Sequence, residues 1–155
     1  RGLLVTRLEP MRISQLYQVR GALDALAAQL AAKRCAEIPA ALIREGRSAA
    51  GEGNVRAMIE ADIAFHRAIY EASGNPYIVD TALVHWIHLR RVMGAVLMHG
   101  ETRADIWDEH EAICSAIRAG DGALAATLSE GHADNARESL VSRLELALTL
   151  APRAA

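Results

Sequence analysis

The sequence predicts an all-α fold, an antiparallel six-helix bundle with a central ligand or metal pocket. Alanine and leucine, the strongest helix formers, are the two commonest of its 155 residues. The chain holds only four prolines and six aromatic residues, which argues against a β-sandwich or a β-barrel. Apolar residues also recur at helical spacing between short breaks that contain glycine or proline. Joints this short place consecutive helices side by side and antiparallel.

The first three helices follow from apolar spacing and from the residues that interrupt it. A stripe of apolar residues begins after Pro10 and predicts a long first helix that ends near Cys35. Pro39 opens a shorter second helix, which ends in the glycine-containing stretch 51–53. A third helix follows and stops at residues 72–74, where a glycine suits a left-handed end.

The last three helices are separated by short capping signals. Asn75 is a good N-cap residue, so we expect the fourth helix at about residues 76–99. The fifth helix is expected at about 102–119, before a glycine. Asp121 then caps a sixth helix, which continues to about Leu150.

Charge and cysteine content restrict the class of protein. The 17 basic and 19 acidic residues give a net charge of -2, which offers no electrostatic footprint for nucleic acid or for an anionic membrane. No uncharged apolar run approaches the roughly 20 residues of a membrane span. Two cysteines, Cys35 and Cys114, are too few for a disulfide framework. We therefore expect both to act as small hydrophobic side chains with free thiols, in a cytoplasmic protein.

The domain organisation follows from where the helical pattern begins and ends. Residues 1–9 lack a helical period and are expected to be a linker from a preceding domain. Residues 10–150 form the bundle, and residues 151–155 are a C-terminal tail. We expect one domain with one core, because this length can bury a core without disulfides or metals.

Four metal-ligating side chains fall in phase with apolar stripes on three helices. Asp62 and His66 are four residues apart, so they project from nearly the same side of the third helix. His110 and His132 lie among apolar residues of the fifth and sixth helices. An isolated Asp–His pair is usually a surface hydrogen bond, and one buried histidine is usually a satisfied core residue. A carboxylate and three imidazoles together are better explained by convergence on a divalent cation.

The fourth helix carries the other three histidines. His85 and His88 could form an alternative ligand pair, but they flank Trp86 and Ile87, which we take as its inner face. At least one of the two is therefore expected to be solvated. His99 lies at the expected C-terminus of the helix, where an imidazole complements the helix dipole.

Two arginines and one asparagine also break the apolar pattern. Arg20 lies in the middle of the first apolar stripe, and Arg90 is in phase with the expected inner face of the fourth helix. A guanidinium that faces a core keeps its charge and needs an anionic partner. Asp24 could form an ion pair with Arg20, and the long side chain of Arg90 could extend to the solvent-exposed edge of the bundle. Alternatively, both arginines line a pocket that holds a carboxylate ligand, to which Asn135 also donates.

Several segments occur together and in order across the chain, and they resemble a known family. They are Leu-Tyr-Gln-Val-Arg at 16–20, Asp-Ile-Ala-Phe-His at 62–66, Ala-Ser-Gly-Asn-Pro at 72–76, Glu-His-Glu-Ala-Ile at 109–113, Ala-Ile-Arg-Ala-Gly-Asp at 116–121, and His132. The chain from about 10 to 150 resembles the FCD domain. This is the C-terminal effector-binding and dimerisation domain of the FadR subfamily of GntR-type bacterial transcription regulators. The six-helix count resembles the VanR-like branch.

The resemblance implies a divalent metal site, with zinc or nickel expected and manganese or iron as alternatives. Its ligands would be the residues Asp62, His66, His110 and His132. It also implies that the metal and nearby residues hold a small organic acid, with Arg20 as the pocket arginine and Arg90 or Arg91 as a second. The domain would form a homodimer, and DNA would be bound only by a winged helix-turn-helix domain that precedes it in the family.

The resemblance and the residues together favour a sensor over an enzyme. A metal with open positions could activate water, but Glu109 and Glu111 project roughly 100° to either side of His110 and supply no base there. A purely structural metal is a third interpretation. The acid remains open among lactate-like, sugar, aromatic and dicarboxylic acids. The alanine-rich faces of the first and fourth helices are candidates for the dimer contact.

Overall fold

A computed structural model describes residues 8–97 and 106–150, and these residues form an all-α bundle of six helices. The helices are α1 (Pro10–Lys33), α2 (Ala40–Gly51), α3 (Val55–Ala72), α4 (Pro76–Val96), α5 (Ile106–Arg118) and α6 (Gly122–Leu150). The predicted all-α six-helix bundle is therefore confirmed, but within the described residues α1 and α2, and likewise α4 and α5, are not packed side by side as expected of consecutive helices. The expected linker at 1–7, the positions 98–105 with His99, and the tail at 151–155 lie outside the described residues.

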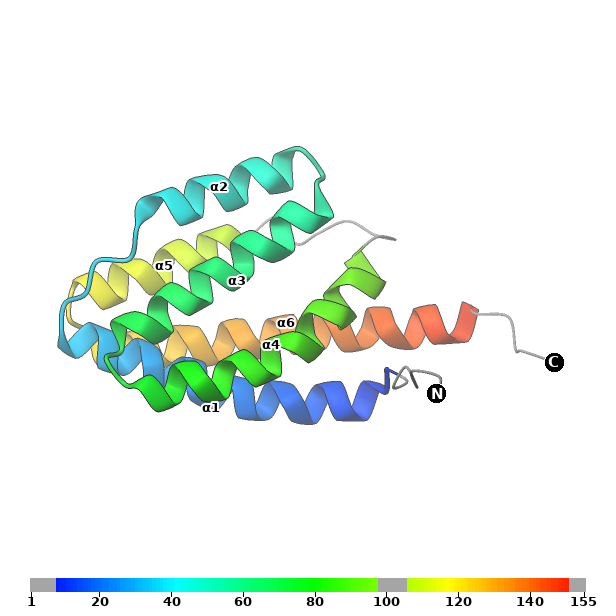
Figure 1. Cartoon of the computed structure of the whole chain (residues 1–155), viewed down its shortest axis with the longest axis horizontal. Coiled ribbons are helices and arrows are strands. Elements are labelled where there is room, and N and C mark those ends of the chain that lie inside the picture. Colours follow the sequence, from blue (N-terminus) through cyan, green and yellow to red (C-terminus); the bar gives the residue numbers. More distant parts are fainter. Residues whose placement is uncertain (1–7, 98–105, 151–155) are drawn as a thin grey trace, which may run out of the picture.

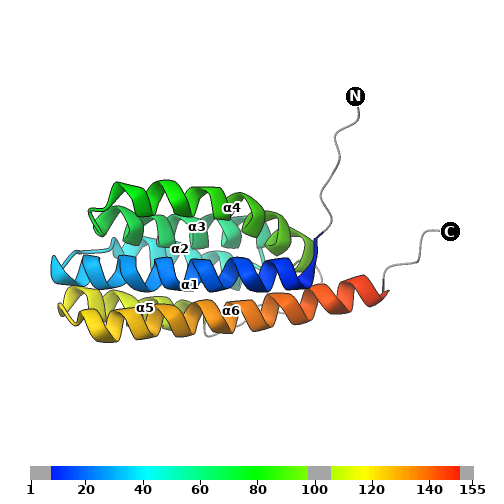
Figure 2. The same ribbon diagram turned by 90° about the horizontal axis from the view of Figure 1, so that it is seen from below.

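Helix α1 is the central element of the bundle. Figures 1 and 2 show α1 and α6 side by side and antiparallel, with α3 and α4 on one side of α1. Helix α1 contacts α3, α4, α5 and α6, while α2 contacts α3 and α5 at the edge. None of the six described helices combines the length and the apolarity that a membrane crossing requires.

Small residues let the helices approach closely near the centre. A Cβ on Gly21 of α1 would lie 3.4 Å from the Cβ of Ala133 on α6. A Cβ on Gly46 of α2 would lie 2.0 Å from the indole ring of Trp107, so α2 can cover this ring only because position 46 has no side chain. The Trp107 ring in turn packs edge-on against His110 at 4.7 Å between ring centroids. The outer helix therefore helps to fix the orientation of an inner histidine.

Side-chain caps define the starts of α4 and α6 as expected. Asn75 Oδ1 accepts a hydrogen bond from the Tyr77 backbone N–H, and Asp121 Oδ1 accepts one from the Leu124 N–H. Gly74 before the first of these caps has a φ of +71°, in the left-handed region.

The inner face of α4 differs from the expected one. Trp86 and Met93 are buried, but Leu83 and Ile87 are exposed. Apolar residues occur on more than one side of this helix, so periodicity alone does not define one inward stripe. The true inner face is the set Ile78, Ala82, Trp86, Leu89, Val92, Met93 and Val96.

The two cysteines also differ from each other. Cys114 is half-buried, and burial raises the pKa of its thiol to about 11, as suits a small hydrophobic residue. Cys35 is exposed, which corrects the expectation for that residue. It follows the C-terminus of α1 with a φ of +46°, where the chain turns toward α2.

Candidate functional site

The four predicted metal ligands come together in the core. Asp62 and His66 project from α3, His110 from α5 and His132 from α6, and all four are buried. One ligand atom from each residue lies within 4.8 Å of the others. The closest atoms are His110 Nε2 and His132 Nε2, at 3.2 Å. Asp62 Oδ1 lies 3.4 Å from His110 Nε2 and 3.7 Å from His66 Nε2.

These donors fit a divalent cation in both spacing and chemistry. With metal–nitrogen bonds of about 2.0–2.1 Å, two ligands of a tetrahedral zinc site lie about 3.3–3.4 Å apart. The three separations above bracket that value. Within the described part of the chain, buried Asp62 Oδ1 has no hydrogen-bond partner. A buried carboxylate oxygen without a partner is costly, and a cation among these atoms would compensate it.

Burial sets the protonation of the two ligands on α3. Burial, together with Arg20, His132 and His110 nearby, holds the pKa of His66 well below its usual value. The imidazole of His66 is therefore neutral, which is the form that ligates a metal. Burial raises the pKa of Asp62, although the charge of Arg20 opposes the rise. The carboxylate thus carries a desolvation cost at neutral pH.

Glu109 orients His132 from the neighbouring helix α5. His132 Nδ1 lies 2.7 Å from Glu109 Oε2, and the other carboxylate oxygen accepts a hydrogen bond from Asn135 Nδ2 at 2.9 Å. A hydrogen bond at Nδ1 leaves Nε2 of His132 to face the cluster, as in many metal sites. From the sequence, Glu109 was weighed only as a base beside His110, and helical spacing gives no sign of this contact between two helices. Asn135 was expected in the pocket, but it is exposed and holds Glu109 instead, because position 135 faces α5.

Arg20 is buried beside the cluster and has several partners. Its Nε donates to Asp24 Oδ2 at 3.1 Å, and one terminal nitrogen donates to the Tyr17 hydroxyl at 3.1 Å. The other terminal nitrogen donates to His66 Nε2 at 2.8 Å. The guanidinium also lies over the Trp86 ring, 4.4 Å from its centroid. The Asp24 pair, one of the two alternatives for Arg20, is therefore present, and the same arginine also lines the cavity.

The charge of Arg20 is secure in this environment. Burial alone would lower its pKa, but the charge of Asp24 outweighs that effect and raises it. Asp24 also accepts a hydrogen bond from the Tyr70 hydroxyl. Burial raises the pKa of Tyr17 to about 12, so its hydroxyl keeps its proton. The buried pair of Arg20 and Asp24 is thus fixed by two tyrosines.

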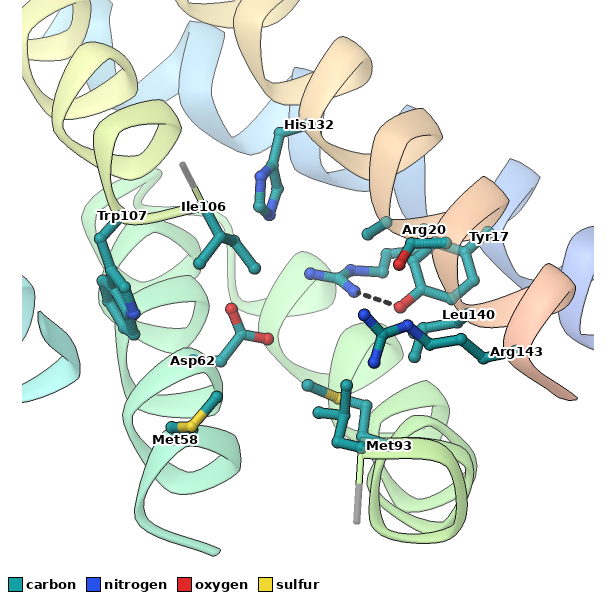
Figure 3. A pocket seen from close by; sticks show the side chains of 13 residues that line it. Tyr17, Arg20, Met58, Asp62, Met93, Ile106, Trp107, His132, Leu140 and Arg143 are labelled. Atoms are coloured by element: carbon teal, nitrogen blue, oxygen red, sulfur yellow. Dashed lines mark hydrogen bonds between the residues drawn. The ribbon is translucent and has the colours of Figure 1, made fainter. Parts of the chain in front are cut away.

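A cavity of about 70 Å³ adjoins the cluster. Figure 3 shows Asp62 and His132 at one side of it and the guanidinium groups of Arg20 and Arg143 facing them. The remaining walls are mainly apolar, from the side chains Met58, Met93, Leu97, Ile106, Trp107, Ala136 and Leu140. Arg143 is not among the pocket residues predicted from the sequence. Its spacing from His132 along α6 puts both on one helix face, which is the signal that could have found it.

Arg90 is a correction to the predicted site. It lies on the surface and forms an ion pair with Glu60 of α3 at 2.6 Å, with both side chains about half exposed. Its expected inward position followed from the wrong inner face of α4. On the same helix, His88 is exposed and His85 is half-buried, so the solvation expected of at least one is confirmed. Neither belongs to the buried Asp–His cluster.

Comparisons with known proteins agree with the geometry. The family model described as "FCD domain" matches residues 15–135. A similar protein from Streptomyces ambofaciens is described as an uncharacterized HTH-type transcriptional regulator in an unstable DNA locus. It is 29% identical over 136 residues, which cover 84% of this chain and 56% of that protein. The chain thus spans little more than half the length of this relative. On the family match and the six-helix fold, the chain belongs to the FCD domain family.

Proposed function

We propose that this domain senses a small organic acid through a bound divalent metal and passes the signal to the DNA-binding part of a transcription regulator. The observation that carries the proposal is the buried cluster of Asp62, His66, His110 and His132 beside a cavity that also receives Arg20. The HTH-type relative supports a regulator that contacts DNA through a separate N-terminal domain. The six helices suit the VanR-like branch.

The metal would be held by the carboxylate of Asp62 and the three histidines. Zinc or nickel is the expected ion, and manganese or iron would also accept these ligands. When bound, the metal supplies a Lewis-acidic position for a carboxylate oxygen. Because Asp62 and His132 both line the cavity, an acid in the cavity can reach the metal side of the site.

The cavity walls favour an acid with an apolar body. Arg20 and Arg143 provide positive charge for a carboxylate, and Tyr17 and Ser139 add hydroxyl groups. Methionine, leucine, isoleucine and tryptophan side chains form most of the rest. Such walls offer few partners for the many hydroxyls of a sugar acid, which would be buried without hydrogen bonds. An aliphatic or aromatic carboxylate therefore fits better, and Met58 and Met93 can adjust to its shape.

Sensing requires the acid to favour one arrangement of the bundle. The site joins α1 through Arg20, α3 through Asp62 and α6 through His132, so one ligand contacts three helices. If the acid binds one packing of these helices more tightly than another, it increases the population of the first packing. That change would alter the relative placement of the attached DNA-binding domains. We expect this in a homodimer, for which exposed Val84 and Ile87 on α4 offer an apolar contact surface.

The proposal is tested by metal content and by thermal stability. The domain is expected to purify with one divalent ion or to bind one stoichiometrically after stripping, as measured by elemental analysis. The metal-loaded protein is then melted with acetate, benzoate, hexanoate, succinate and gluconate. We expect the apolar-bodied acids to raise the melting temperature most. If no acid shifts the melt of the loaded protein, the sensor function is wrong.

Chelation separates a sensory metal from a purely structural one. A structural site contributes directly to folding, so its removal would unfold the domain. A sensory site can lose its metal with the helical content intact, while the acid response disappears. We expect the second result, because the core continues beyond the cluster through Ile69, Leu89, Ile113 and Ile117.

A further inference from the structure

The atom of His66 that faces the metal site is already occupied by Arg20. The terminal nitrogen of Arg20 lies 2.8 Å from His66 Nε2, and this same Nε2 lies 3.7 Å from Asp62 Oδ1 in the cluster. An arginine can only donate hydrogen bonds, so Nε2 must accept with its single lone pair. A metal ligand would need that same lone pair.

The surroundings of His66 leave this nitrogen as the ligating one. Its other nitrogen, Nδ1, lies 3.6 Å from Oδ2 of Asp24, which is not one of the four cluster residues. Nδ1 therefore carries the proton of the neutral ring, and Nε2 is the acceptor. The site cannot use all three histidines while Arg20 keeps this hydrogen bond.

We propose that Arg20 is a positioning residue that blocks His66 Nε2 without metal and turns to the carboxylate of the acid when His66 becomes a ligand. This inference rests on the proposed function. Arg20 keeps its hydrogen bond to Asp24 through Nε, so only the terminal nitrogen has to change partner. The cavity that Arg20 lines is where that nitrogen can find an anion.

Electrostatics gives the exchange a direction. Arg20 stays charged, so a dication on the cluster would face a guanidinium at close range until an anion lies between them. Metal binding without acid is therefore opposed by Arg20, and metal binding with acid is assisted by it. By linkage, the metal must strengthen acid binding by the same factor. The acid therefore binds the metal-loaded domain more tightly than the metal-free domain.

The test is a calorimetric titration of metal-stripped protein with Zn²⁺ alone. We compare the wild type, Arg20→Gln, Arg20→Lys and the surface control Arg90→Gln. Lysine keeps the charge but lacks the planar fork that reaches Asp24 and His66 together. Arg20→Gln is expected to bind zinc more tightly than the wild type by about fivefold or more, Arg20→Lys, which keeps the opposing charge, to show a smaller gain, and Arg90→Gln to match the wild type. A residue with a merely structural role would weaken zinc binding when replaced.

The outcomes separate this inference from the proposed function. Unchanged or weaker zinc binding in folded Arg20→Lys overturns the blocking role of Arg20, while the sensor function stands. Zinc binding by the wild type no tighter than by His132→Ala overturns the proposed function itself. If circular dichroism shows Arg20→Gln unfolded, Arg20→Lys, which retains a cation for Asp24, decides the question.

A second measurement addresses the transfer to the acid. The acid that shifts the melt most in the panel above is added to the zinc titrations. It is expected to increase zinc affinity in the wild type and in Arg90→Gln, and to have a smaller effect in Arg20→Gln. An equal increase in all three proteins would show that Arg20 does not couple the two ligands.

Discussion

Helices α1 and α4 both flank the site, but Arg20 on α1 and Arg90 on α4 lie in opposite environments. Arg20 on α1 is buried, with Asp24 one turn away and also buried. Arg90 on α4 is half exposed and reaches Glu60 on α3. No acidic residue lies three or four positions from Arg90 on its own helix. A buried guanidinium requires a nearby anion, and Asp24 supplies one to Arg20 from the same helix.

The largest effect on stability should come from removing each of the two arginines in turn. Arg20→Ala leaves Asp24 as a buried carboxylate without its cation, and we expect a loss of about 3–5 kcal/mol in the free energy of unfolding of the metal-free domain. Arg90→Ala removes a surface pair and should change it by less than about 0.5 kcal/mol. Urea unfolding at pH 7 measures both. Similar losses for the two variants would mean that the burial of Arg20 has no energetic consequence.

The same contrast explains what the sequence could and could not predict. The convergence of Asp62 and His132 was predictable, because each lies in phase with a single apolar stripe. The position of Arg90 was not, because Leu83 and Ile87 gave α4 a second apolar side. Arg20 has a carboxylate one turn away and Arg90 has none, which is the sequence difference between these two arginines.

Contacts between helices were the least predictable part of the site. Glu109 and His132 are far apart in the sequence, and only the packing of α5 on α6 brings their side chains to 2.7 Å. Arg143 enters the cavity because α6 continues well past the cluster. Helical phase identifies which face of a helix is inside, but it does not tell which side chain on the next helix lies opposite.

Two histidines, one in the buried cluster and one on the surface of α4, should differ in their effect on zinc affinity. His132→Ala removes one of the four buried ligands and should reduce zinc affinity by about 100-fold or more. Replacing a residue that only hydrogen-bonds to a metal ligand already costs about 10–100-fold in affinity. His88→Ala, on the exposed side of α4, should leave the affinity unchanged. Competition with a chromophoric chelator measures both constants. Equal zinc affinity in the two variants would remove His132 from the metal site.

A smaller effect is expected where support for the cluster comes from the neighbouring helix. Glu109→Gln keeps the shape but loses the charge that holds His132 Nδ1, and zinc affinity should fall by about 10–100-fold. Asn135→Ala removes only an exposed neutral donor to Glu109 and should cost less. The same chelator competition ranks the two variants. A larger loss for Asn135→Ala would favour the position in the acid pocket first expected for it.

The smallest effect should be a gain in stability. Burial raises the pKa of Asp62, so the folded metal-free domain binds a proton there more tightly than the unfolded chain does. Its contribution to stability is therefore present below the unfolded pKa and is lost as the pH rises through the folded one. Asp62→Asn avoids that loss and should stabilise the metal-free domain by about 1 kcal/mol at pH 7. The gain should shrink as the pH falls toward 4.

Unfolding by urea at pH 4, 5.5, 7 and 8 measures this difference between Asp62→Asn and the wild type. The same variant should lose most of its zinc affinity, because a neutral amide is a weak ligand for zinc compared with a carboxylate. Greater stability together with lost zinc binding would show that Asp62 serves metal binding and does not stabilise the fold. A variant less stable than the wild type at every pH would instead make Asp62 part of the packed core.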